Sequence, residues 1–404
     1  MKVCLISSGY IKSDPRYYFL ANTFKQEGYE VSLLNIFLDP SHSAELLSPK
    51  DYKILLDYNV LNIDFYKYRS PGYVIKSPDY FYHYSHELIP IFVKNYIEKN
   101  NNESFLQSDL FYGLDFFWGG VIAQQFSQIT KKTFIVDFKE LFSDMGNNYP
   151  EESLNNIRNL EKDCISNALC IPCVSQKIID FYQSKYIRDQ KKFVLLENSR
   201  PFDYLTPNFS KEKKAKVRFI VSAGDANNNR GFNELAKIWE ALNPTNAELD
   251  IRISNITEEQ KNQIINISSK THDKSLHLIP SVLEDRMTDS LLSYDCGIIP
   301  YLADRNLNQK YCCPNKFGQY LNAGLAIVSS NTDYISQKII QNDLGVIYNP
   351  KDINDSIKIF RDLIDNPDQL VIKRINAHNF CKENYEWNNH IQPFLAIIKN
   401  YFVK

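Results

Sequence analysis

The chain has 404 residues, of which 44% are hydrophobic and 23% are charged, and its formal net charge is −2. This length favours two or three domains over one, and the composition is that of a globular protein. The near-neutral charge argues against a nucleic-acid binder held by bulk electrostatics, so we do not expect nucleic acid as a partner.

The cysteines and the first residues indicate the compartment. The chain has eight cysteines, and free cysteines at this frequency are typical of a reducing cytoplasm. Cys170 and Cys173 form a lone C-x-x-C, for which buried strand cysteines are the better interpretation and a zinc site the alternative. The first residues, MKVCLISSGY, indicate a short strand rather than a signal peptide, and no apolar run reaches membrane-spanning length. We therefore expect a soluble cytoplasmic protein.

The first half of the chain predicts a parallel α/β domain. Residues 3–7 (VCLIS) form a continuous apolar run, typical of a strand that is buried on both faces. Asp14 and Pro15 favour a helix start, and Gly28 ends that helix before a second strand over 29–36. Strands and helices alternate again after residue 102, which is typical of a doubly wound domain. The predicted strands are 108–115, 132–138, 168–175 and 192–198, and the predicted helices are 116–126, 154–168 and 177–186.

Residues 39–102 interrupt this alternation and are dense in aromatic side chains. We interpret them as loops and short helices inserted into the first domain. Residues 65–84 interleave Tyr and Phe with Lys67, Arg69 and Lys76. Such a segment would suit stacking on the sugar rings of an acceptor or contact with an anionic membrane surface. The alternative is that it forms the core and rim of a large domain.

A second alternation begins at Val217, after a polar and basic segment, 198–216, that we interpret as a linker. Its predicted strands are 217–224, 248–254, 275–280, 294–302, 325–330 and 344–349, and its predicted helices are 231–242, 258–268, 281–293, 315–323, 353–364, 367–385 and 388–402. The pattern predicts two tandem Rossmann-like, doubly wound domains that face each other across a cleft.

Two predicted helix starts in the second domain carry basic residues. Arg230 and Gly231 open one helix, and Pro314, Asn315 and Lys316 open another. Ligands of open parallel sheets bind at the carboxyl ends of the strands, and helix N-termini favour phosphate. Lysine adds a point charge and arginine a bidentate fork. These residues predict a diphosphate cradle, and the alternative is a pair of solvated first-turn cations.

Four stretches, in chain order, carry a resemblance to a known family. They are SDPRYYFLANTFKQEGYEVSLL, DLFYGLDFFWGGVIAQQ with FIVDFKELFSD, FIVSAGDANNNRGFNELAKIWEAL and DCGIIPYLADRNLNQKYCCPNKFGQYLNAGLAIVSS. The last is similar to the pattern D-x-G-(apolar)₂-P, a variable loop, and P-x-K-x-x-E-Y-(apolar)-x-x-G-x-P-(apolar)-V. Over nearly its whole length the chain resembles the group 1 nucleotide-sugar glycosyltransferases (glycogen-synthase-like, family 4 type) of the GT-B fold.

The resemblance implies a domain layout. It implies an acceptor-side domain over 1–197, a donor nucleotide-sugar domain over 217–386, and a C-terminal helix, 387–404, that crosses back to the first domain.

The resemblance also implies roles for residues of the donor domain. Lys316 matches the Lys of P-x-K, and Arg230 matches the basic residue before a glycine. Gln319 stands where the family has the Glu that binds the donor ribose, and Tyr311 stands near the Glu that touches the transferred sugar. Asp225 stands where a second phosphate-binding Arg is expected. The implied donor-binding set is Gly224, Arg230, Gly231, Tyr311, Pro314, Asn315, Lys316 and Gln319.

Residues of the first domain match family positions on the acceptor side. Asp115 follows a predicted strand and matches a position that faces the acceptor, and its alternative role is a helix cap. The other implied acceptor-side residues are Gly9, Asp14, Asp137 and Glu140, of which the three acidic residues could also act as caps. The implied catalytic set is Asp115, Lys316 and Arg230.

The implied reaction is glycosyl transfer from a nucleoside-diphosphate sugar to a hydroxyl of a glycan or lipid-linked acceptor, with retention of configuration. It needs no metal and no cofactor other than the donor. The implied setting is bacterial surface polysaccharide or glycoconjugate synthesis, in the cytoplasm or peripherally on the inner face of the cell membrane. The alternatives are a non-catalytic nucleotide-sugar or glycan-binding partner subunit and a sugar-nucleotide epimerase of the same fold.

Overall fold

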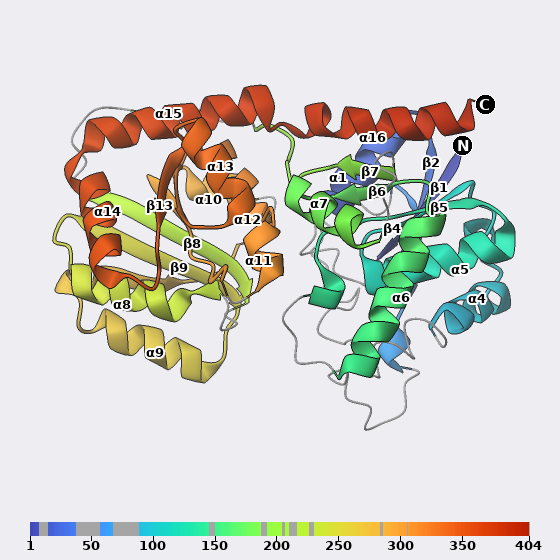
Figure 1. The fold of residues 1–404 in the computed structure, drawn as a ribbon, viewed down its shortest axis with the longest axis horizontal. Helices are drawn as coiled ribbons and strands as arrows, with labels where there is room; N and C mark the ends of the chain where they lie inside the picture. Colours follow the sequence, from blue (N-terminus) through green and yellow to red (C-terminus); the bar gives the residue numbers. More distant parts are fainter. Residues whose placement is uncertain are drawn as a thin grey trace. The chain divides into compact units, whose positions relative to one another are not determined.

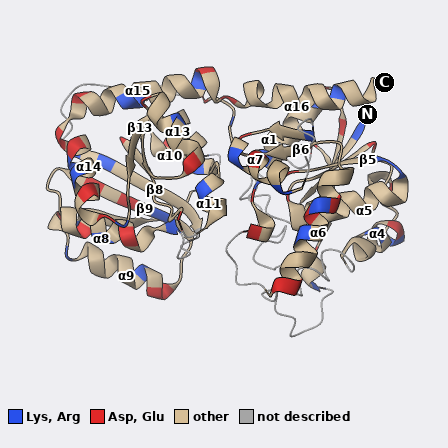
Figure 2. Ribbon diagram, in the orientation of Figure 1, with Lys and Arg blue, Asp and Glu red and all other residues tan. Residues whose placement is uncertain are grey.

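The computed structural model of the protein describes residues 1–7, 15–37, 57–67, 89–144, 150–186, 192–203, 207–209, 216–225, 230–282, 286–304 and 306–403. The chain divides into two compact units, one of residues 1–196 with 393–404 and the other of residues 197–392 (Figure 1). Residue 197, which we assigned to the first domain, and residues 198–203, at the start of the expected linker, belong to the second unit. Acidic and basic residues are spread over both units (Figure 2), in keeping with the net charge of −2.

The first unit contains a parallel sheet with the strand order β3-β2-β1-β4-β5. Strand β1 (Lys2–Ser7) pairs with β2 (Glu30–Ile36) on one side and with β4 (Leu110–Gly113) on the other. The apolar residues of β1 are fully buried, as its continuous apolar run predicts. The outer strands are β3 (Asn59–Ile63) and β5 (Thr133–Val136), and a separate parallel pair is formed by β6 (Ile171–Cys173) and β7 (Phe193–Leu195).

Helices pack on both faces of this first sheet. Phe111 and Tyr112 are adjacent on β4, so their side chains point to opposite faces. Phe111 packs against Phe126 of α5 (Val121–Thr130), and Tyr112 packs against Phe24 of α1 (Pro15–Gln26), with ring centroids 5.5 and 6.4 Å apart. A π-helical turn over Phe116–Gly120 leads into α5, and the other helices are α4 (Ile89–Lys99), α6 (Glu151–Asn167) and α7 (Gln176–Lys185).

The interpretation of residues 39–102 as only loops and short helices is wrong, because β3 lies within them and extends the sheet. The sequence of β3, NVLNI, does not alternate apolar and polar residues, and asparagine is uncommon in strands. Its amides instead bond across to β2: Asn35 Nδ2 donates to Asn62 Oδ1 at 2.9 Å, and Asn59 Nδ2 donates to Ser32 Oγ at 3.3 Å. Most of the aromatic segment 65–84 lies outside the described residues.

The second unit contains a parallel sheet with the strand order β10-β9-β8-β11-β12-β13. Its strands are β8 (Val217–Asp225), β9 (Ala247–Asn255), β10 (Leu276–Ile279), β11 (Cys296–Ile299), β12 (Ala326–Ser330) and β13 (Gly345–Tyr348). Its helices are α8 (Phe232–Leu242), α9 (Glu258–Ser268), α10 (Met287–Leu291), α11 (Leu307–Tyr311), α12 (Asn315–Asn322), α13 (Asp333–Gln341), α14 (Ile353–Asp365) and α15 (Pro367–Asn384).

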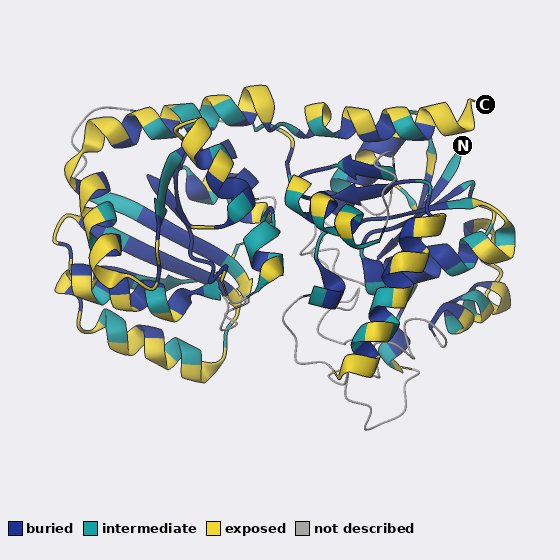
Figure 3. Cartoon of the chain, viewed as in Figure 1, coloured by how far each residue is buried: buried dark blue, intermediate teal, exposed yellow. Residues whose placement is uncertain are grey.

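One face of this second sheet carries a continuous apolar core. Trp239 of α8 and Phe360 of α14 both pack against Phe219 of β8, with ring centroids 5.4 and 5.6 Å apart. The opposite face contacts α12, which packs on β11 and β12, and α10, where the Ser290 hydroxyl accepts from Arg252 of β9 at 2.9 Å. Figure 3 shows that the central strands of this sheet are mostly buried and the edge strands β10 and β13 mostly intermediate, whereas the outer sides of α8, α9 and α14 are exposed.

Three helices of the second unit differ from the prediction. The helix expected over 281–293 is described only as α10, which has five residues. Helices α11 and α13 form where we predicted none. Asn306 caps α11 by accepting hydrogen bonds from the N–H groups of Asn308 and Gln309 at 2.7 and 3.3 Å, which supports a helix that is otherwise too short to be stable.

The C-terminal helix α16 (Trp387–Phe402) returns to the first domain, as expected. From Pro393 onward it belongs to the first unit, where Phe394 packs edge-on against Tyr112 with ring centroids 5.8 Å apart. Lys399 forms an ion pair with Glu27, just after α1. Among the described residues, no helix combines the length and apolar character needed to cross a membrane.

Candidate functional site

The end of β11 lies against the start of α8 at the carboxyl edge of the second sheet. Gly231 is the N-cap of α8 and has a φ of 69°, a left-handed conformation that favours glycine. A Cβ atom on Gly231 would lie 1.7 Å from the carbonyl oxygen of Pro300, the residue after β11. A glycine is therefore needed for Pro300 and α8 to approach this closely.

Tyr301 follows Pro300 and contacts two basic side chains. Arg230 Nη1 donates a hydrogen bond to the Tyr301 hydroxyl at 2.6 Å, and Arg230 Cζ lies 5.1 Å from the centroid of the Tyr301 ring. Lys316 Nζ lies 4.9 Å from the same centroid. Both cations are within cation–π range of one ring. The two residues that the sequence assigned to the phosphate cradle are therefore brought together.

Helix α12 begins at Asn315, as predicted, and holds Lys316 in its first turn. Its N-cap residue, Pro314, has no side-chain oxygen, and neither has Gly231, the N-cap of α8. Neither residue can therefore cap its helix with a side-chain hydrogen bond. The positive ends of both helix dipoles add to the charges of Arg230 and Lys316.

Contacts with β11 and β8 hold α12 in place. The ring of Tyr320 occupies the space that a side chain at Gly297 would need, since a Cβ there would lie 2.3 Å from the ring. The Tyr320 hydroxyl accepts a hydrogen bond from the N–H of Ser222 at 2.9 Å. Asp295, of the same D-x-G pattern, is 3% exposed and has a structural partner, since its Oδ1 lies 3.1 Å from Arg374 Nη1.

Contacts with residues distant in the sequence hold Cys313, the residue before Pro314, in place. Asn198 Nδ2 donates to the carbonyl oxygen of Cys313 at 2.6 Å, and the Cys313 sulfur lies 2.8 Å from the Tyr385 hydroxyl. Burial raises the pKa of the Cys313 thiol, so this thiol stays protonated. Lys338 Nζ pairs with the nearby buried Glu197 at 3.3 Å. These contacts, which the sequence did not indicate, position the start of α12.

The other predicted donor-site residues differ in their exposure. Gln319 is 7% exposed on α12, whereas Tyr311, at the end of α11, and Pro314 are half-buried. Asn315 is exposed, and so is Gly224, where a Cβ would meet no atom within 4 Å. The side chain of Asp225 lies outside the described part of the chain, as do residues 226–229.

The structure corrects the placement of Asp137 on the acceptor side. Its carboxylate is fully buried: Oδ2 lies 2.7 Å from Arg16 Nε and accepts from the Tyr112 hydroxyl at 3.0 Å, and Oδ1 accepts from Arg16 Nη2 at 3.2 Å. Arg16 Nη1 also donates to the carbonyl oxygen of Leu196 at 2.7 Å. Asp137 therefore ties α1 to the end of β5 inside the domain.

The other acceptor-side residues have local structural contacts or lie outside the described residues. Asp115 Oδ1 accepts from the N–H of Gly119 at 3.2 Å, which is the capping role that we gave as the alternative. Glu140 is half-buried, and its carbonyl oxygen lies 3.1 Å from the Tyr182 hydroxyl. Gly9 and Asp14 lie outside the described residues.

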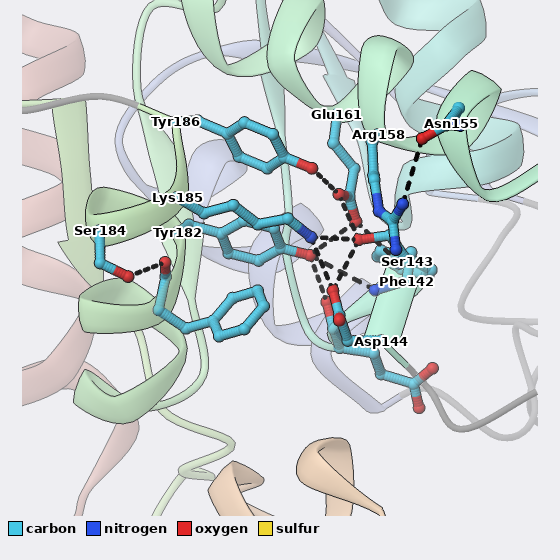
Figure 4. A network of polar contacts seen from close by, with 12 residues as sticks. Phe142, Ser143, Asp144, Asn155, Arg158, Glu161, Tyr182, Ser184, Lys185 and Tyr186 are labelled. Carbon is cyan, nitrogen blue, oxygen red and sulfur yellow. Dashed lines mark hydrogen bonds and ion pairs between the residues drawn. The ribbon is translucent and has the colours of Figure 1, made fainter. Parts of the chain in front are cut away.

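The loop after β5 is held by a network around Glu161 of α6 (Figure 4). Glu161 is fully buried and accepts hydrogen bonds from the Ser143 N–H at 3.0 Å and the Ser143 hydroxyl at 2.7 Å. The hydroxyls of Tyr182 and Tyr186 donate to it at 3.0 and 2.6 Å. Lys185 donates to the Ser143 hydroxyl at 2.8 Å. Burial raises the pKa of both tyrosines, and Glu161 raises it further, so they act as donors.

Comparison with known proteins decides the fold. No family model matches the chain, and no curated protein is similar enough in sequence to count as a relative. Sucrose-phosphate synthase from Thermosynechococcus elongatus matches with a TM-score of 0.76 at 10% identity, over 100% of this chain and 99% of that one. HepE from Anabaena, solved in complex with UDP, matches with a TM-score of 0.65 at 11% identity, over 99% and 100%. A putative UDP-N-acetylglucosamine 2-epimerase from Listeria monocytogenes matches with a TM-score of 0.60 at 15% identity, over 99% and 96%.

These matches extend over both units. The chain has the GT-B fold. The predicted architecture of two Rossmann-like domains is thereby confirmed. At sequence identities of 10–15%, these matches show a shared fold but not a shared activity, so the activity has to be argued from the site.

The close approach at Gly231 gives a testable prediction for this GT-B chain. Gly231→Ala is expected to lower the free energy of unfolding of the second unit by at least about 2 kcal/mol, because alanine resists the left-handed φ and its Cβ would overlap Pro300. Gly224→Ala is the matched control, since a Cβ there meets open space. Urea denaturation measures both variants, and equal stabilities would contradict the packing of Pro300 on α8.

The Glu161 network gives a second prediction. Glu161→Gln is expected to destabilise the first unit by about 1–3 kcal/mol, because the amide replaces an acceptor with a donor that faces buried hydroxyls. Glu152→Gln, on the exposed surface of the same helix, is the control and is expected to stay within about 0.5 kcal/mol of wild type. Denaturation followed by circular dichroism measures both, and a wild-type stability for Glu161→Gln would show that the network does not hold the loop.

Proposed function

We propose that this GT-B protein transfers a sugar from a nucleoside-diphosphate sugar to a hydroxyl of a glycan or lipid-linked acceptor. The observation that carries the proposal is the pair of cations, Arg230 and Lys316, on one ring between two helix starts. This edge of an open α/β sheet is where such folds bind ligands. Two cations and two helix dipoles suit the two phosphates of a donor better than they suit a neutral ligand.

In the proposed reaction, the acceptor hydroxyl attacks C1 of the donor sugar. The bond between C1 and the diphosphate oxygen breaks, the nucleoside diphosphate leaves with the electron pair, and its phosphate takes up the proton of the acceptor hydroxyl. Negative charge grows on the leaving group, and cations already fixed in place stabilise it without reorganising. Lys316 and Arg230 supply that stabilisation, Gln319 lies near the ribose, and Tyr311 lies near the transferred sugar. No cofactor other than the donor is needed.

We propose that the first unit binds the acceptor near Gly9, Asp14, Asp115 and Glu140. Attack from the face that the leaving group vacates, assisted by its phosphate, retains the anomeric configuration and needs no strong protein base. The setting is bacterial surface polysaccharide or glycoconjugate synthesis, in the cytoplasm or peripherally on the inner face of the cell membrane.

A thermal-shift panel with UDP, GDP, ADP, CMP and their sugar conjugates tests the donor site. A ligand at 100 times its Kd adds about 2.7 kcal/mol of stability. In a domain of this size, that corresponds to a rise in Tm of about 5–10 °C. A shift with one nucleoside diphosphate and its sugar conjugate supports the proposal and identifies the donor class. No shift with any nucleotide rejects it.

The second candidate function is sugar-nucleotide epimerisation. It is favoured by the match to the Listeria epimerase structure, which has the same fold. A binding subunit without catalysis is a third candidate, because Tyr311 and Asp225 replace an expected acid and an expected cation. The products separate the three: a transferase releases nucleoside diphosphate, an epimerase returns a new nucleotide sugar, and a binding subunit leaves the donor unchanged.

A further inference from the structure

We propose that Tyr301 is a positioning residue that sets the separation of Arg230 and Lys316 for a diphosphate. The inference rests on the proposed function and deepens it. Tyr301 is 3% exposed, and its ring lies 5.1 Å from Arg230 Cζ and 4.9 Å from Lys316 Nζ. The two cations are therefore at most about 10 Å apart, a range that the two phosphates of one nucleotide can bridge.

The backbone of the preceding residue fixes where the Tyr301 ring lies. Pro300 abuts Gly231, because a Cβ on that glycine would be 1.7 Å from the Pro300 carbonyl oxygen. The dipeptide Pro300–Tyr301 therefore joins the start of α8, through Gly231 and Arg230, to the start of α12, through Lys316. A shift of this dipeptide would move both halves of the cradle.

Tyrosine has a chemical advantage over an acidic residue at this position. Two like charges near one another repel, and the negative face of an aromatic ring attracts both. The Tyr301 hydroxyl also accepts a hydrogen bond from Arg230 at 2.6 Å, which orients the guanidinium. A carboxylate would hold the cations as well but would cancel their charge. Tyr301 holds them without adding a negative charge of its own.

This role predicts that loss of the Tyr301 ring weakens diphosphate binding more than monophosphate binding. A diphosphate uses both cations, whereas a monophosphate can use one. Tyr301→Leu is expected to weaken nucleoside diphosphate binding about tenfold and monophosphate binding less than about threefold. Tyr301→Phe keeps the ring and loses the hydroxyl, so we expect an intermediate loss of about threefold for the diphosphate.

Tyr294 offers a matched control at the other end of β11. Arg218 Cζ lies 4.5 Å from the centroid of the Tyr294 ring, and the Tyr294 hydroxyl donates to Asp250. Tyr294→Leu therefore removes a similar cation–π contact and a similar hydroxyl, away from the cradle. We expect it to lower stability and to leave the ratio of diphosphate to monophosphate affinity at the wild-type value.

Calorimetric titration of the full chain tests the inference by measuring two affinities. One is for whichever of UDP, GDP or ADP binds the wild type, and the other is for the corresponding monophosphate. A fall in the affinity ratio for Tyr301→Leu, with Tyr301→Phe between it and wild type, supports the positioning role. Equal losses for both nucleotides, or none, overturn it and leave the proposed function standing. If Tyr301→Leu does not fold, the ratio for Tyr301→Phe decides, and an unchanged ratio overturns the role. A wild type that binds none of the diphosphates rejects the proposed function and this inference together.

Discussion

Lys316→Met is expected to weaken nucleoside diphosphate binding by at least about 30-fold, because it removes a buried charge from the site that we propose for the phosphates. Lys316 is 6% exposed and lies in the first turn of α12. Methionine keeps the apolar stem of the lysine, so the change is confined to the ammonium group and its contact with Tyr301. Isothermal titration with the diphosphate that stabilises the wild type measures the effect.

Lys310→Met is the matched control for this variant. Lys310 lies on α11, its side chain is 40% exposed, and its Nζ is 3.6 Å from Asp333. An exposed ion pair of this kind contributes little, so the affinity is expected to change less than about twofold. Wild-type affinity in Lys316→Met would remove Lys316 from the donor site, and equal weakening in both variants would point to a general effect of net charge.

Arg374→Met is expected to destabilise the second unit by about 3–5 kcal/mol, because it removes one partner of a buried ion pair and leaves the Asp295 carboxylate buried. Arg374 Nη1 lies 3.1 Å from Asp295 Oδ1, and the side chains are 2% and 5% exposed. Arg374 Nε also donates to the carbonyl oxygen of Gly324 at 3.1 Å, at the end of α12. Urea denaturation, followed by tryptophan fluorescence and circular dichroism, measures the loss.

Two variants separate the buried charge from lost packing. Arg361→Met, on the exposed face of α14, is expected to stay within about 0.5 kcal/mol of wild type. The double variant Arg374→Met with Asp295→Asn removes both charges of this ion pair, so it is expected to be more stable than Arg374→Met alone. If the double variant is less stable than the single one, lost packing rather than the unpaired carboxylate explains the effect.

Much of the fold follows from local pattern. Continuous apolar runs such as residues 3–7 predict buried parallel strands, and the helices between them begin and end close to the residues that favour caps. The exceptions have local causes. Strand β3 is stabilised by asparagine amides that bond across to β2, and α11 depends on the cap at Asn306. Neither feature produces a hydrophobic period that would reveal it in the sequence.

The candidate site was only partly predictable. Arg230 and Lys316 stand at helix starts, where the chemistry of phosphate binding can be read from a few consecutive residues. Tyr301 could have drawn attention because it follows the proline of D-x-G-(apolar)₂-P, but its role depends on contacts with two distant segments. The role of Asp137 also depends on a contact with a distant segment. Its partner, Arg16, is 121 residues away in the chain, so the sequence placed a buried ion-pair residue at the acceptor site.

The central claim is that the protein breaks the bond between a sugar and a nucleoside diphosphate. The most direct test follows the bound sugar nucleotide by ¹H and ³¹P NMR, with wild type and Lys316→Met in parallel. We expect free nucleoside diphosphate to accumulate with wild type, slowly with water as acceptor and faster with a glycan acceptor, and not with Lys316→Met. A nucleotide sugar that keeps its diphosphate bond and changes only the configuration of its sugar would contradict the claim and establish the epimerase instead.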